Sequence, residues 1–133
     1  MRYKRKAGKK TIQSKKGVYD GIKFASQLEI FMYKQLKDND IEFGYEAEVF
    51  HLIEGFHSDN MSFERTATKP IANRGEKKVL GIKYTPDFVS DKFMIETKGR
   101  ANESFPIRWK LFKRLLHLNN DTRVLYKPCL LYT

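Results

Sequence analysis

The sequence predicts a single α/β domain, because helix-like and strand-like segments alternate along one chain. Segments 24–37 and 104–119 repeat apolar residues every three or four positions, as amphipathic helices do. Segments 41–49 and 79–98 have the alternation, or the β-branched and aromatic content, of strands. The chain has 133 residues, of which 41% are hydrophobic, so it can bury one compact core. We therefore expect one folded domain over residues 20–133.

Residues 1–19 are expected to form a basic, mobile arm ahead of this domain. Residues 1–16 contain eight Lys or Arg and no acid, with few apolar side chains that could pack. The formal net charge of the whole chain is +10, and the basic excess returns in residues 98–127 after an acidic middle. This distribution favours a polyanionic partner such as nucleic acid, with a solubilising tail as the alternative reading of the arm.

Cysteine usage and hydropathy define the expected compartment. Cys129 is the only cysteine, which excludes an intramolecular disulfide and a cluster of cysteine metal ligands. The sequence has no apolar run of about 18 residues that could span a membrane, and no apolar core of a secretory signal. We expect a protein with no membrane partner, located in the cytoplasm.

The first predicted helix covers residues 24–37 and should end near Asp38-Asn39-Asp40. Glu29 lies at the edge of its apolar stripe. A strand is then expected over residues 41–49, where apolar residues alternate with acids that should form a solvated face. The apolar stripe of the helix consists of Phe24, Leu28, Phe31, Met32 and Leu36, and the acids of the strand are Glu42, Glu46 and Glu48.

Residues 54–78 contain several Gly, Pro, Asn and Asp residues without a sustained period. We expect a long irregular loop there, with a short strand around residues 63–68. Residues 79–89 and 93–98 then read as two extended segments joined by a turn at Ser90-Asp91-Lys92, which together predict a hairpin.

A second helix is expected from Ser104 to Asn119, with Pro106 in its first turn. Residues 122–126 should add a further short strand to the sheet. The apolar face of the helix is predicted to be broad, and it consists of Ile107, Trp109, Leu111, Phe112, Leu115, Leu116 and Leu118.

The hairpin carries the residues that point most clearly to chemistry. Its strands read Tyr84-Thr85-Pro86-Asp87-Phe88 and Met94-Ile95-Glu96-Thr97-Lys98-Gly99. Carboxylate oxygens are the ligands that Mg²⁺ and Mn²⁺ prefer, so Asp87 and Glu96 are the expected metal ligands. The Thr97 backbone carbonyl could complete the oxygen shell. Side-chain alternation sets Lys98 on the face of Glu96, where its ammonium could orient the attacking water or stabilise developing negative charge.

The alternative is structural: Asp87 would be a turn residue after Pro86, and Glu96 with Lys98 an exposed ion pair. A third acid from another element is expected if the site holds two ions, and Glu29 is the candidate. As a common helix former, Glu29 could equally be a solvated helix residue.

These two strands resemble the Pro-Asp…Glu-x-Lys nuclease superfamily, and in particular the bacteriophage endonuclease I family of Holliday-junction resolvases. The segment from Asp20 to Glu29 also resembles a family of small phage proteins with that fold. The resemblance covers roughly residues 20–50 and 79–115, and it places the family's acidic residues on Glu29, Asp87 and Glu96 and its lysine on Lys98.

The resemblance implies a restriction-endonuclease-like fold, in which α-helices flank a mixed β-sheet. It also implies Mg²⁺- or Mn²⁺-dependent cleavage of DNA by a homodimer that cuts two strands symmetrically. The expected activity is hydrolysis of phosphodiester bonds in branched DNA or Holliday junctions, during recombination or genome packaging. A sequence-directed restriction- or transposition-type nuclease, or a non-catalytic nucleic-acid-binding module, are the alternatives.

Basic residues outside the hairpin are candidates for DNA contacts. Arg108 falls within the apolar arc of the second helix, where it would need to pair with an acid or reach a phosphate. The other basic residues of that helix could follow the DNA backbone or form a solvated face. The candidate contacts are Lys4, Arg5, Lys6, Lys9, Lys10, Arg100, Arg108, Lys110, Lys113 and Arg114.

Overall fold

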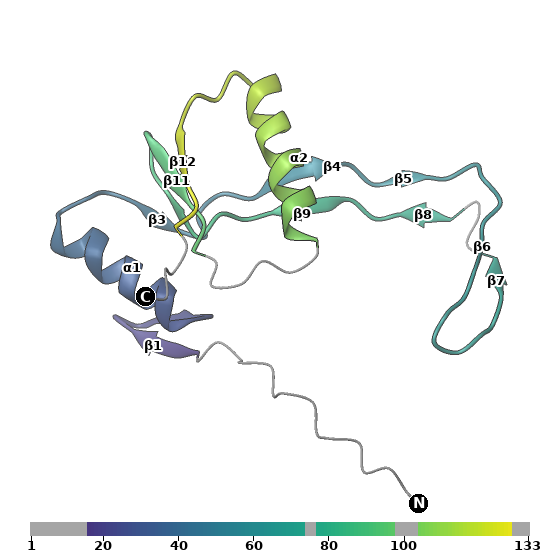
Figure 1. Ribbon diagram of the computed structural model, residues 1–133, viewed down its shortest axis with the longest axis horizontal. Coiled ribbons are helices and arrows are strands. Elements are labelled where there is room, and N and C mark those ends of the chain that lie inside the picture. Colours follow the sequence, from purple (N-terminus) through teal and green to yellow (C-terminus); the bar gives the residue numbers. More distant parts are fainter. Residues whose placement is uncertain (1–15, 74–76, 98–103, 129–133) are drawn as a thin grey trace, which may run out of the picture. The chain divides into compact units, whose positions relative to one another are not determined.

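The computed structural model describes residues 16–73, 77–97 and 104–128 (Figure 1). In these residues the chain has a mixed α/β structure, with two helices and several small sheets. The predicted α/β class is therefore confirmed. The chain separates into two compact units, Met1–Glu42 and Phe43–Thr133, and each is described by itself.

The first unit contains a hairpin and a helix. Strands β1 (Gly17–Tyr19) and β2 (Ile22–Phe24) pair antiparallel around Asp20-Gly21, both of which have positive φ. An Asp-Gly pair suits a two-residue hairpin turn of this kind, because both positions require the left-handed region. Strand β1 lies within the segment that was expected to be part of the arm, and residues 1–15 of that arm lie outside the described residues.

Helix α1 (Gln27–Asp38) starts later than the spacing of apolar residues predicts. Ser26 is its N-cap and forms a capping box with Glu29, so Phe24 belongs to β2 instead. The buried stripe is also rotated from the predicted one: Ile30, Tyr33 and Leu36 are buried, whereas Phe31 is 56% exposed. Asn39 caps the helix at the predicted end.

The second unit is built on a four-stranded sheet in the order β12-β11-β10-β3. The predicted hairpin is confirmed in β10 (Phe88–Val89) and β11 (Phe93–Ile95), which pair antiparallel with Phe88 opposite Ile95. Its turn is closed by the Ser90 amide, which donates to the Phe93 carbonyl. The predicted strand after the second helix is β12 (Val124–Tyr126), which runs parallel to β11.

Helix α2 (Phe105–Leu118) follows the predicted boundaries, with Pro106 in the first turn. Its apolar face is narrower than predicted, since Ile107 and Leu118 are exposed. The buried face packs with residues of β4, β9, β10 and β11 to form the hydrophobic core of this unit. The core consists of Tyr84, Val89, Met94, Phe105, Phe112 and Leu116, with Phe50, Leu52, Trp109 and Leu125 partly buried against it.

The prediction of a strand over residues 41–49 is wrong except at β3 (Gly44–Tyr45), which pairs with β10. The chain leaves the sheet at Glu46, whose φ of 49° is incompatible with a strand. The alternating acids therefore do not form one strand face.

The prediction of a largely irregular loop over residues 54–78 is also wrong, although the short strand expected around residues 63–68 is present as β6 (Phe63–Glu64). Strand β4 (Phe50–Ile53) pairs with β9 (Ile82–Tyr84), and β5 (Phe56–His57) with β8 (Lys78–Val79), along one extended ribbon (Figure 1). Beyond it, β6 (Phe63–Glu64) pairs with β7 (Ala72–Asn73). Gly81 permits the close approach of the two chains, because a Cβ there would lie 2.6 Å from the Ile53 carbonyl oxygen.

Neither helix in the described part of the chain is long and apolar enough to cross a membrane.

Candidate functional site

The ends of three strands bring polar side chains together in the second unit. Tyr84 ends β9, Asp87 immediately precedes β10, and Glu96 and Thr97 follow β11. Continuing the Phe88–Ile95 register by one residue sets Asp87 opposite Glu96 on the same face of the hairpin. The four polar side chains are buried, although Asp and Glu rarely are. Burial contradicts the reading of Glu96 as part of an exposed ion pair, whereas the reading of Asp87 as a turn residue after Pro86 stays open.

Thr97 fixes the orientation of the Asp87 carboxylate. Its backbone amide and its hydroxyl each donate a hydrogen bond of 2.7 Å to Asp87 Oδ2. Because both bonds end on Oδ2, Thr97 orients the carboxylate without using Oδ1. The sequence singled out Thr97 for its backbone carbonyl, and that role stays a prediction; the structure adds the amide and the hydroxyl.

Glu96 is oriented by a residue that sequence reasoning missed. The Tyr84 hydroxyl donates a 2.6 Å hydrogen bond to Glu96 Oε2, and the Glu96 amide donates to the Tyr126 carbonyl of β12. Burial raises the pKa of the Tyr84 phenol well above its usual value, and the charge of Glu96, its hydrogen bond and the charge of Asp87 raise it further. The phenol therefore stays protonated at neutral pH, where it donates to Glu96. The sequence feature that could have indicated this contact is the tyrosine two residues before the Pro86-Asp87 pair.

Replacing Tyr84 by phenylalanine should lower the free energy of unfolding by about 1–3 kcal/mol, because a buried carboxylate loses a donor. Chemical denaturation at neutral pH measures the change. Tyr126→Phe is the matched control, since Tyr126 is exposed and its change should stay within about 0.5 kcal/mol. Equal effects of the two substitutions would contradict a special contact between Tyr84 and Glu96.

Glu46 is a second residue that the sequence did not assign to the site. Its amide donates to the Asp87 carbonyl at 2.9 Å. Its carboxylate and that of Asp87 each offer an oxygen within 4.8 Å of the other, a spacing that a shared cation could bridge. The side chain is exposed, as expected, but it lies beside Asp87 instead of on a strand face. The sequence did not indicate this position, because the alternation around Glu46 is typical of a strand, whereas the contact with Asp87 depends on the left-handed turn at Glu46.

Glu29 lies in the first unit and is buried, so the reading of it as a solvated helix acid is wrong. Its Oε2 accepts hydrogen bonds from the Ala25 and Ser26 amides, at 2.7 and 3.2 Å. These bonds satisfy backbone donors at the start of α1 and give Glu29 a role in stabilising the helix. Its role as a metal ligand stays a prediction.

The remaining predicted site residues divide into two groups. Lys98, Arg100 and the basic residues Lys4, Arg5, Lys6, Lys9 and Lys10 lie outside the described residues. The basic residues of α2 are exposed, and Lys113 Nζ lies 5.9 Å from the centre of the Trp109 ring. Arg108 is thus not buried within the apolar face. Exposure leaves these side chains accessible to a polyanion, and the predicted DNA contacts of Arg108, Lys110, Lys113 and Arg114 stay predictions.

The second unit thus defines a mixed α/β protein with two buried, hydrogen-bonded carboxylates at adjacent strand ends. The chain belongs to the family described as "Protein of unknown function (DUF1064)", whose sequence model matches residues 9–127. That description names no activity. Comparisons with curated proteins and with solved structures gave no match.

Proposed function

We propose that this protein is a metal-dependent endodeoxyribonuclease that hydrolyses phosphodiester bonds in branched DNA, including four-way junctions. The observation that supports it most is the pair of buried carboxylates, Asp87 and Glu96, held across one hairpin by Thr97 and Tyr84. Keeping two buried acids is costly unless polar partners or a cation compensate them. A restriction-endonuclease-like arrangement of the domain is part of the same proposal.

The chemistry of the donors fits Mg²⁺ or Mn²⁺. Asp87 and Glu96 are proposed to supply hard carboxylate oxygens. Glu46 offers a further carboxylate oxygen within 4.8 Å of one of Asp87. A divalent ion bound there would neutralise phosphate charge and lower the pKa of a bound water. Thr97 and Tyr84 would keep the two carboxylates in place, and Lys98 is proposed to orient the attacking water. Glu29 remains the proposed additional acid, on the basis of the sequence resemblance.

The charge of the chain supports DNA as the substrate. A formal net charge of +10 favours a polyanion, and the basic residues of α2 are exposed. Hydrolysis adds water across one P–O bond, so that one strand end keeps the phosphate and the other gains a hydroxyl. Cutting a junction symmetrically requires two such sites, which is the reason for proposing a homodimer.

Cleavage of matched substrates tests the proposal. A labelled four-way junction, a linear duplex of the same sequence and the single strands are incubated with the protein and either Mg²⁺ or EDTA. Cutting of the junction that requires Mg²⁺ and exceeds cutting of the duplex supports a junction-selective nuclease. Equal cutting of junction and duplex would favour a general or sequence-directed nuclease. Binding of DNA without cleavage in Mg²⁺ or Mn²⁺ would contradict the nuclease proposal and indicate a non-catalytic nucleic-acid-binding module.

A further inference from the structure

The segment that carries Glu46 has an unusual backbone. Glu46 is in the left-handed region, with φ of 49°, which residues other than glycine adopt only where their surroundings hold them. The chain folds back tightly here, because a Cβ on Gly44 would lie 2.5 Å from the Ala47 Cβ. Contacts on either side of this turn must therefore keep the Glu46 carboxylate beside Asp87.

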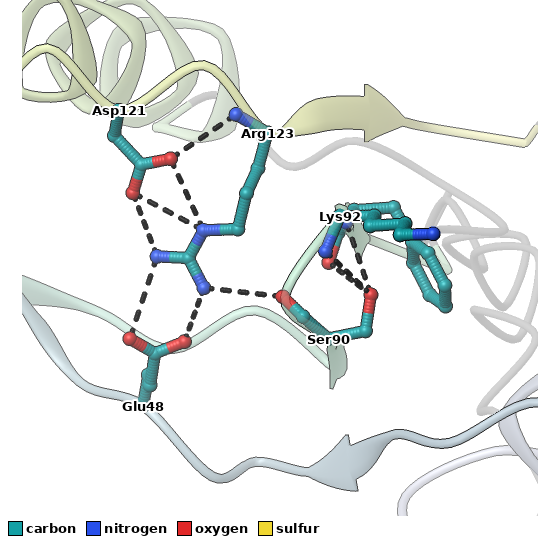
Figure 2. Close-up of polar contacts among 6 residues, drawn as sticks. Glu48, Ser90, Lys92, Asp121 and Arg123 are labelled. Carbon is teal, nitrogen blue, oxygen red and sulfur yellow. Dashed lines mark hydrogen bonds and ion pairs between the residues drawn. The ribbon is translucent and has the colours of Figure 1, made fainter.

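One such contact is the hydrogen bond from the Glu46 amide to the Asp87 carbonyl. The next is made two residues later, where Glu48 forms an ion pair with Arg123 at 2.5 Å (Figure 2). The first contact ties the turn to the strand end that carries Asp87. The second ties it to residues more than 70 positions away in the sequence, which no local pattern could supply.

Arg123 is the centre of a network that joins three segments of the second unit. Its guanidinium donates to both carboxylate oxygens of Asp121, to Glu48 and to the Ser90 carbonyl in the turn between β10 and β11 (Figure 2). Its side chain is only 18% exposed. Hydrogen bonds with Asp121 and then Glu48 raise the pKa of Arg123, and the Arg123 hydrogen bond lowers that of Asp121. A planar fork of donors suits this arrangement, whereas a lysine ammonium does not.

The same residue is coupled to the strand that supports Glu96. Arg123 precedes β12, and the Tyr126 carbonyl of β12 accepts the Glu96 amide. The Val124 amide donates to the Lys92 carbonyl in the turn beside Ser90. Arg123 thus holds the Glu46–Glu48 segment against the sheet elements that carry the other two acids.

We propose that Arg123 is a positioning residue: by binding Glu48, it holds the Glu46 carboxylate beside Asp87. Its consequence for metal binding rests on the proposed function, but the positioning itself does not. Arg123 need not touch substrate or metal. It acts through the two-residue link from Glu48 to Glu46.

Amide hydrogen exchange tests the positioning directly. In Arg123→Gln, the Glu46 amide should exchange about tenfold faster or more than in the unchanged protein, because a charge-assisted contact that holds its turn is lost. The Phe112 amide, in the middle of α2, reports global unfolding and should change far less. Lys92→Gln is the matched control, since it removes a positive charge from the neighbouring turn without removing a contact to Glu48. Unchanged Glu46 exchange in a folded Arg123→Gln protein would overturn the proposal.

Glu48→Gln provides a second, milder variant should Arg123→Gln fail to fold. It should also accelerate exchange at Glu46, and Arg123→Lys should fall between Arg123→Gln and the unchanged protein. If Glu48→Gln leaves exchange at Glu46 unchanged, Arg123 does not act through Glu48 and the proposal fails.

Calorimetric titration with Mn²⁺ tests the consequence. Arg123→Gln should weaken Mn²⁺ binding by about tenfold, as loss of a residue that supports a ligand commonly does. In a Glu46→Gln background the same substitution should cause little further loss. An equal loss in both backgrounds would show that Arg123 does not act through Glu46. If the unchanged protein binds no Mn²⁺, the proposed metal site fails, while the exchange measurement still decides whether Arg123 positions Glu46.

Discussion

Replacing Asp87 by asparagine should reduce Mg²⁺-dependent DNA cleavage by at least about a hundredfold, since loss of a residue that only supports a metal ligand already costs 10–100-fold. Asparagine has nearly the same shape as aspartate and can still accept the two hydrogen bonds from Thr97. The fold should therefore persist, while the negative charge that attracts a cation is lost. The initial rate of junction cleavage at saturating Mg²⁺ measures the effect.

The matched control is Asp91→Asn, because Asp91 lies in the exposed turn of the same hairpin. Its cleavage rate should stay within about twofold of the unchanged protein, as expected for a surface substitution away from the site. Equal rates for the Asp87 and Asp91 variants, in a protein that does cleave DNA, would exclude Asp87 from the active site.

Truncating Phe112 to alanine should cost about 3–5 kcal/mol of unfolding free energy in the second unit. Phe112 is completely buried, and its ring lies 4.6 Å from that of Tyr84 and 5.0 Å from that of Phe50, measured between ring centres. Alanine would leave a cavity that these large rings cannot readily fill. The effect would reach the site, because Tyr84 also holds Glu96.

Urea denaturation followed by tryptophan fluorescence measures this loss. Trp109 is the only tryptophan and its ring lies 5.7 Å from that of Phe112, so its emission reports unfolding of this unit. Leu118→Ala on the same helix is the control: Leu118 is 58% exposed, and its substitution should change stability by about 0.5 kcal/mol or less. A loss below about 1 kcal/mol for Phe112→Ala would contradict its placement at the centre of the core.

The parts of the fold that sequence predicted are those determined by local interactions. Helix α2 has a proline in its first turn and a clear apolar period, and the hairpin has a polar turn between two apolar strands. The correct start of α1 could also have been predicted, since Ser26 and Glu29 have the spacing of a capping box. The apolar period, which begins at Phe24, indicated an earlier start instead. The β4–β9 and β5–β8 ribbon was not predictable from local pattern, because its paired residues are 21 to 34 positions apart in the sequence and mostly exposed.

In the candidate site, too, local contacts could be predicted from the sequence and long-range contacts could not. Asp87, Glu96 and Thr97 were predicted to lie together because one hairpin delivers them. Tyr84 belongs to the same stretch of sequence, yet its contact with Glu96 depends on how β9 meets the sheet. Glu46 and Arg123 come from other segments, and only tertiary structure brings them to this hairpin.

Diffraction from crystals soaked in Mn²⁺, recorded at the manganese absorption edge, tests most directly whether the two buried carboxylates hold a divalent ion. We predict an anomalous peak in contact with carboxylate oxygens of both Asp87 and Glu96, and no such peak in crystals of Asp87→Asn. A crystal at saturating Mn²⁺ with no peak at these carboxylates would contradict the proposed metal site and, with it, the nuclease mechanism.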